Sequence, residues 1–84
     1  MMQNYKLEFI LHTHNSTREG IKGSLSEFGE GLEISEYNET DSKGNNFKIN
    51  LITQDPTVIF DICGQIGRIR QVKIDEEPLL ADNG

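Results

Sequence analysis

The architecture of this chain follows from the stretch YKLEFILHT, residues 5–13. From residue 5 to residue 11 the odd positions are apolar, and the even positions are polar apart from Ile10. Because successive side chains of a strand point to opposite faces, a period of two predicts a strand with one face in a hydrophobic core.

A polar turn and a helix are predicted directly after this strand. Residues 16–19 read Ser-Thr-Arg-Glu, the pattern of a capping box in which Ser16 accepts a hydrogen bond from the amide of Glu19. Ile21, Leu25 and Phe28 then recur at the spacing of one helical face. We therefore expect a helix that starts after Ser16 and packs through this stripe.

The remainder of the chain predicts strand, strand, helix and strand. Residues 32–37 are expected to form a strand whose alternation slips before Tyr37, which indicates a β-bulge or an edge strand that twists out of register. Residues 47–51 alternate strictly, and Val72 and Ile74 are expected on the core face of the last strand. Asp55 and Pro56 predict the start of the second helix. Its apolar stripe comprises Ile59, Ile62, Cys63 and Ile66.

The order βαββαβ predicts an α+β, ferredoxin-like fold, in which two helices cover one face of a four-stranded antiparallel sheet. Since strands joined through a helix run parallel with right-handed crossovers, the first and third strands should lie at the centre. The predicted strand order is 4-1-3-2. We expect one domain over residues 1–75 and a disordered tail over 76–84.

Charge and composition restrict the classes of partner. The 84 residues carry eight Lys and Arg against fourteen Asp and Glu, a formal net charge of −6. Such a chain repels phosphate backbones and anionic membranes, so we expect no nucleic acid and no membrane contact by this segment. With one cysteine, no secretory apolar region after Met1 and no run of membrane-spanning length, the expected location is the cytoplasm.

No set of residues predicts a reaction. His12 and His14 lie two positions apart, a spacing that could place two imidazoles on one metal, but no third ligand accompanies them, which favours a solvated pair and no metal. Cys63 falls on the buried stripe of the second helix, so it is expected to serve core packing. We therefore predict no catalytic residues, no cofactor and no enzymatic activity.

The sheet face opposite the helices offers one positive signal. Ile10 and Ile52 are expected there among polar side chains, where they would form a small apolar spot that serves as an interaction surface. The alternative is two unrelated exposed aliphatic side chains, which would need no function.

The stretch at residues 5–12 and the ending IGRIRQVKI, residues 66–74, resemble ACT-type regulatory modules over about residues 5–75. In particular they are similar to the soluble C-terminal domain of MgtC/SapB-type membrane proteins. This resemblance implies a cytoplasmic domain of a membrane protein that is linked to magnesium homeostasis. It also implies a ligand site between the first strand and the first helix, at His12, His14, Asn15, Ser16 and Thr17.

Two functions follow as expectations. The first is a regulatory or protein-interaction module that forms a homodimer or binds another protein domain, through a sheet edge, the open sheet face or a helix flank. The alternative is a stand-alone ACT-type domain that senses an amino acid or another small ligand. Amino-acid-binding ACT domains usually carry a glycine at the strand–helix junction, whereas the first glycine here is Gly20, which favours the interaction role.

Overall fold

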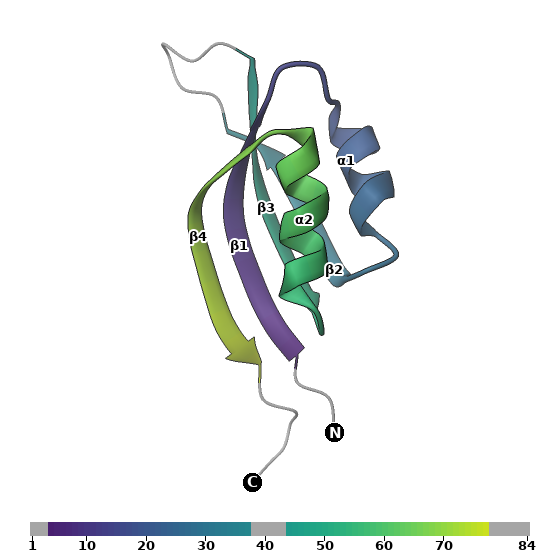
Figure 1. Ribbon diagram of the computed structural model, residues 1–84, viewed down its shortest axis with the longest axis vertical. Coiled ribbons are helices and arrows are strands. Elements are labelled where there is room, and N and C mark those ends of the chain that lie inside the picture. Colours follow the sequence, from purple (N-terminus) through teal and green to yellow (C-terminus); the bar gives the residue numbers. More distant parts are fainter. Residues whose placement is uncertain (1–3, 38–43, 78–84) are drawn as a thin grey trace, which may run out of the picture.

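The computed structural model describes residues 4–37 and 44–77, which form six elements in the predicted order. The elements are β1 (Asn4–Thr13), α1 (Arg18–Leu25), β2 (Glu30–Glu36), β3 (Asn45–Thr53), α2 (Pro56–Ile66) and β4 (Arg68–Glu77). Figure 1 shows the strands side by side with α2 packed across them.

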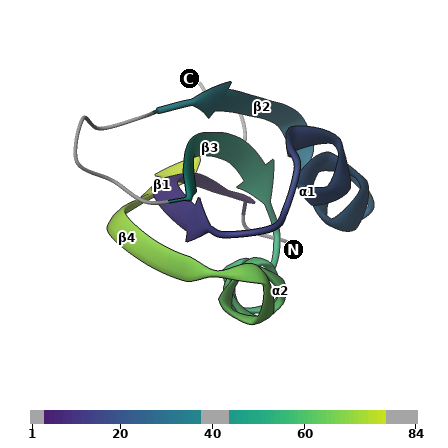
Figure 2. The same ribbon diagram turned by 90° about the horizontal axis from the view of Figure 1, so that it is seen from above.

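The strands form one antiparallel sheet of order β2-β3-β1-β4, which is the predicted order. Figure 2 shows a strongly curved sheet, with α1 near β2 and α2 near β4 on the same face. The α+β, ferredoxin-like arrangement is therefore confirmed. Both β2 and β4 are edge strands.

The core lies between the sheet and the two helices. Leu7, Phe9 and Leu11 of β1 are fully buried, as the period of two predicted. The ring of Phe9 meets that of Phe60 edge to face, with 5.6 Å between the centroids, a favourable geometry for aromatic pairs. The other buried core residues are Ile21, Leu25, Ile34, Phe47, Ile49, Leu51, Ile59 and Cys63.

The start and end of α1 differ from the prediction. The N-cap is Thr17, whose Oγ1 accepts from the amide of Gly20 at 3.1 Å, so the assignment of Ser16 was wrong by one residue. The helix ends at Leu25, and Phe28 lies beyond it with 44% of its surface exposed. Beyond the helix, Gly29 closely approaches β3, where a Cβ atom would overlap the side chain of Leu51.

The predicted bulge in β2 exists, but it lies earlier than expected. The pairing with β3 shifts between Glu30 and Glu33, and Gly31 adopts a φ of +62° inside this shift. A glycine with positive φ is the usual first residue of one bulge type, because it lacks the Cβ atom that would clash.

The final strand also departs from the prediction. Val72 and Ile74 lie on the core face as predicted, but at 45% and 49% exposure they are not buried in the core. Ile74 pairs with Leu7 on the helix side, but β4 is an edge strand, and no other described strand pairs with its outer flank. The pairing with β1 shifts between Glu8 and Ile10, opposite Gln71, which has a φ of +55°. The strand continues to Glu77, beyond the predicted domain end, and residues 78–84 lie outside the described part.

Candidate functional site

The loop predicted to bind a ligand connects β1 to α1. At its start, the Nδ1 atom of His12 lies 2.8 Å from Oδ1 of Asn46 on β3. Because a carbonyl oxygen only accepts, Nδ1 of His12 is the donor in this bond. The imidazole of His12 is therefore held in one orientation by a buried amide.

The rest of the loop is more open. The rings of His12 and His14 meet nearly at right angles, with 5.0 Å between their centroids. His14 and Asn15 are exposed, Ser16 is half-buried, and the hydroxyl of Thr17 is used to cap α1. Within residues 4–37 and 44–77, no group of three His, Cys, Asp or Glu side chains is placed to hold a metal ion.

Two glycines fix the backbone where this loop begins. A Cβ atom at Gly67 would overlap the carbonyl oxygen of His12, and one at Gly44 would overlap that of Thr13. Gly44 also has a φ of +83°. Thr13 is buried, and its Oγ1 finds no hydrogen-bond partner among the described residues. The contact of Gly67 with His12 is not visible in the sequence, because it joins residues that meet only in the folded chain.

A cavity of about 520 Å³ lies away from this loop, where α1 ends and α2 begins. Its lining includes Glu27, Glu30 and Asp55 together with the exposed ring of Phe28. Three carboxylates make this cavity unfavourable for an anion. Residues 12–17 do not line it.

The open sheet face is charged, and the predicted apolar spot at its centre does not form. Ile10 is only 5% exposed, and it lies opposite Lys48 on β3 and Arg70 on β4, whose long stems can cover an aliphatic side chain. Ile52 is half-buried and lies opposite Lys6, four positions along β1 and therefore about 13 Å from Ile10.

The two isoleucines line separate hollows on this face. Ile10, Tyr37 and Lys48 line one of about 220 Å³, and Ile52 lines another of about 330 Å³ beside Lys6. Nζ of Lys48 pairs with a carboxylate oxygen of Glu8 at 3.3 Å. This surface is thus suited to polar contacts, and exposed pairs of this kind contribute little to stability.

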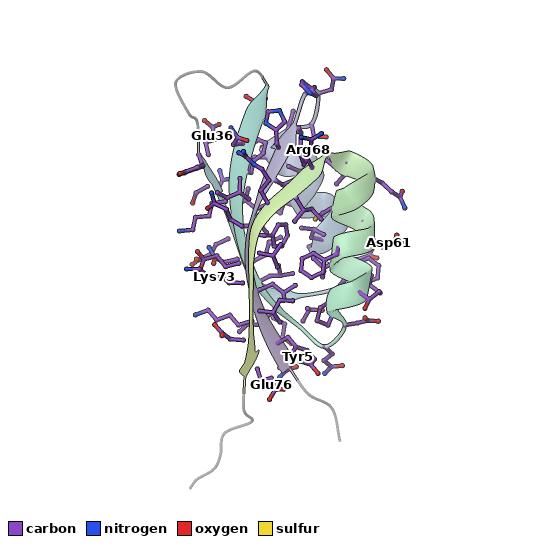
Figure 3. The ribbon with its side chains drawn as sticks, turned by 60° about the vertical axis from the view of Figure 1, so that its left-hand side comes forward. Tyr5, Glu36, Asp61, Arg68, Lys73 and Glu76 are labelled. Atoms are coloured by element: carbon purple, nitrogen blue, oxygen red, sulfur yellow. The ribbon has the colours of Figure 1, made fainter. Side chains whose placement is uncertain are left out.

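The two sheet edges carry different side chains. β2 presents Glu30, Glu33 and Glu36, all exposed. β4 combines the exposed Val72 and Ile74 with charges that change sign along the strand. Its basic residues, Arg68, Arg70 and Lys73, precede its acidic residues, Asp75, Glu76 and Glu77. In Figure 3, Lys73 projects from β4 on the side away from α2.

The thiol of Cys63 is fully buried in the core. Burial disfavours the thiolate and raises the pKa of Cys63 from 9.0 to about 12. Since the thiolate is the nucleophilic form, Cys63 is unsuited to covalent catalysis at neutral pH.

Comparison of the chain with known protein families, curated proteins and solved structures found no match. Among the helices of the described residues, none has both the length and the apolar character needed to cross a bilayer.

Proposed function

We propose that this chain is a non-enzymatic regulatory module that works by binding protein, and that the edge strand β4 is its binding surface. The observation that carries this proposal is the exposure of Val72 and Ile74 on an unpaired sheet edge. An edge strand presents backbone donors and acceptors to a further strand, and exposed aliphatic side chains add apolar area to that contact.

The chemistry of the remaining candidates supports a binding role over a catalytic one. Cys63 is buried with a raised pKa. The imidazole of His12 is bonded to the neutral amide of Asn46, which does not activate it as a base in the way a carboxylate does. The carboxylates of the cavity where α1 ends and α2 begins belong to an exposed acidic surface.

A photo-cross-linking side chain introduced at position 72 tests this function in cells that express the full chain. The same side chain at position 33, on the exposed acidic edge β2, is the matched control. We expect a covalent protein adduct from position 72 and none from position 33. Equal yields from the two positions, or no adduct from either, would contradict a binding role for β4.

We also propose that the chain is an ACT-like domain, that it lies in the cytoplasm, and that it is linked to magnesium homeostasis. They are supported by the sequence patterns at residues 5–12 and 66–74. The βαββαβ order agrees with an ACT-type module, although unrelated functions share this architecture. Magnesium-dependent phenotypes should be measured with a parent protein in which apolar helices are joined to this chain.

Ligand sensing at residues 12–17 is a second candidate function, favoured by the buried, unpartnered Oγ1 of Thr13 beside the exposed His14. A thermal-shift screen of amino acids and divalent cations tests it. A ligand present at about 100 times its Kd should stabilise the fold by about 2.7 kcal/mol. A shift that His14→Ala abolishes would support this site, and a screen without any shift would oppose it.

A further inference from the structure

We propose that β4 pairs with β4 of a second copy of this chain, antiparallel and centred on Ile74, so that two sheets join into one. This inference rests on the proposed function and identifies the partner that the edge fits. It follows from the order of charges along β4 and from the faces on which its side chains lie.

The sheet geometry limits the possible registers. Two identical antiparallel strands related by a two-fold axis must have one residue opposite its own copy. The shift at Gln71, with its positive φ, interrupts regular pairing, which leaves residues 72–77 as the regular part of the edge. The centre of a symmetric pair therefore falls among these residues.

Charge distinguishes between the central positions. A centre at Lys73 places two ammonium groups opposite each other, and a centre at Asp75, Glu76 or Glu77 places two carboxylates there. A centre at Val72 draws the irregular Gln71 into the pairing. A centre at Ile74 places Lys73 of each copy opposite Asp75 of the other, so that unlike charges meet twice.

The same register also groups the apolar side chains. Ile74 pairs with Leu7 on the helix side of the sheet, and Val72 shares that side because it lies two positions away. At this centre Ile74 faces its own copy, with Val72 of each copy as a diagonal neighbour. The two Ile74 side chains would then cover each other, with Val72 in diagonal contact, while Val72 itself lies directly opposite Glu76 of the other copy.

The opposite edge does not offer this complementarity. β2 carries Glu30, Glu33 and Glu36 and no basic residue, so its self-pairing would oppose carboxylates, and natural sheet edges use charge in this way to prevent pairing. The net charge of −6 on each copy also opposes association. Since the regular segment of β4 is short, we expect a reversible monomer–dimer equilibrium.

Charge reversal on the full chain tests both the surface and the register. Sedimentation equilibrium at 0.15 M salt should show an average mass that rises with concentration from 9.5 kDa towards twice that value. Lys73→Glu places carboxylates opposite Asp75 of the second copy, and Asp75→Lys places ammonium groups opposite Lys73. Each variant alone should dimerise about tenfold more weakly or worse.

Mixing the two variants provides the decisive measurement. An equimolar mixture of Lys73→Glu and Asp75→Lys restores unlike charges at both contacts, so a one-to-one heterodimer should form at concentrations where each variant alone is largely monomeric. Thermal unfolding of each variant checks that it is folded. The mixture contains only these same two variants, so a misfolded variant cannot explain why the mixture dimerises. Glu33→Lys, on the other edge, should leave the equilibrium unchanged.

The outcomes separate this inference from the proposed function. The β4 pairing would be overturned if the chain were monomeric at every concentration or if the mixture of the two variants stayed monomeric. It would also be overturned by a dimer that neither charge reversal weakens, or by a dimer that Glu33→Lys weakens. The proposed function would survive any of these results if position 72 still cross-links to a different protein. An adduct of twice the chain mass supports both, and the absence of any adduct removes the binding function itself.

Discussion

Gly64 and Gly67 lie one helical turn apart, but their surroundings differ completely. A Cβ atom at Gly64 would meet nothing within 4 Å, whereas one at Gly67 would meet the carbonyl oxygen of His12. Gly64 lies inside α2, and Gly67 is its C-cap. The first glycine therefore costs helix stability without a packing reason, and the second allows the backbones of β1 and α2 to meet.

Substitution of each glycine by alanine should consequently have opposite effects. Gly64→Ala should stabilise the chain by about 1 kcal/mol, because alanine is the better helix former. Gly67→Ala should destabilise it by about 2 kcal/mol or more, because backbone atoms must move to relieve the overlap. Urea unfolding of both variants measures the difference. Equal effects of the two substitutions would refute the close approach of Gly67 to His12.

The buried thiol of Cys63 should make stability depend on alkaline pH. Its folded pKa of about 12 exceeds its ordinary value of 9.0, so between these values the native state keeps a proton that the unfolded state has released. The free energy of unfolding must then fall as pH rises through this window, and the contribution is fully present below pH 9. The slope is about 1.4 kcal/mol per pH unit.

Comparison of the wild-type chain with Cys63→Ala isolates this contribution, since all other titrating groups are common to both. Urea titrations at several pH values from 8 upward should show the wild type losing stability relative to the variant above pH 9. The variant loses core volume and is therefore less stable at neutral pH. The quantity to compare is how the free energy of unfolding of each protein changes with pH. Parallel pH profiles for the two proteins would show that the thiol does not titrate in this way.

At the scale of single elements, α2 was predicted more accurately than α1. Asp55 and Pro56 start α2 as expected, because proline at the first helical position is compatible with few alternatives. At α1, Ser16 and Thr17 are adjacent hydroxyl residues, and either could cap a helix. The glutamate at position 19 favoured Ser16 by pattern, but the backbone geometry selects Thr17.

The cap of α1 can be tested by removing each hydroxyl separately. Thr17→Ala should cost about 1 kcal/mol, because the amide of Gly20 loses its acceptor at a helix of only eight residues. That loss lowers the midpoint of thermal unfolding by about 4–8 °C in a domain of this size. Ser16→Ala is the matched control, with an expected change of less than about 0.5 kcal/mol. A larger effect of Ser16→Ala would restore the original capping-box assignment.

The edge strands show where an alternating pattern loses its predictive power. Alternation places Val72 and Ile74 on the helix side of β4, but it does not reveal that no helix covers the outer flank of that strand. Ile10 shows the converse, since it lies on the open face and is nevertheless buried between its cross-strand neighbours. Burial depends on what covers a side chain, and the chain pattern specifies only the face.

At the scale of the whole molecule, the sheet order was predictable because the chirality of crossover connections leaves few alternatives. The candidate sites were less predictable. The bond between His12 and Asn46 joins residues 34 positions apart, and Gly44 and Gly67, which closely approach the same loop, are also distant from it in sequence. No local pattern encodes such contacts, so residues 12–17 were identified through a family resemblance and not through their environment.

The sheet order also predicts how stability is distributed over the molecule. β1 pairs with β3 on one side and β4 on the other, and β3 pairs with β1 and β2, so the backbone groups of both central strands are bonded within the sheet. At concentrations where the chain is monomeric, native-state hydrogen exchange should therefore be slowest in Leu7–Leu11 and Phe47–Leu51, where the free energy of opening should approach the global free energy of unfolding.

Alternate amides of β4 point away from β1 and should exchange faster by orders of magnitude. Raising the concentration should then protect the outward-pointing amides among residues 72–76 and leave those of β2 unchanged. Slow exchange of the outward β4 amides in the dilute monomer would mean that another part of the chain already covers this edge, and the proposed binding surface would be lost.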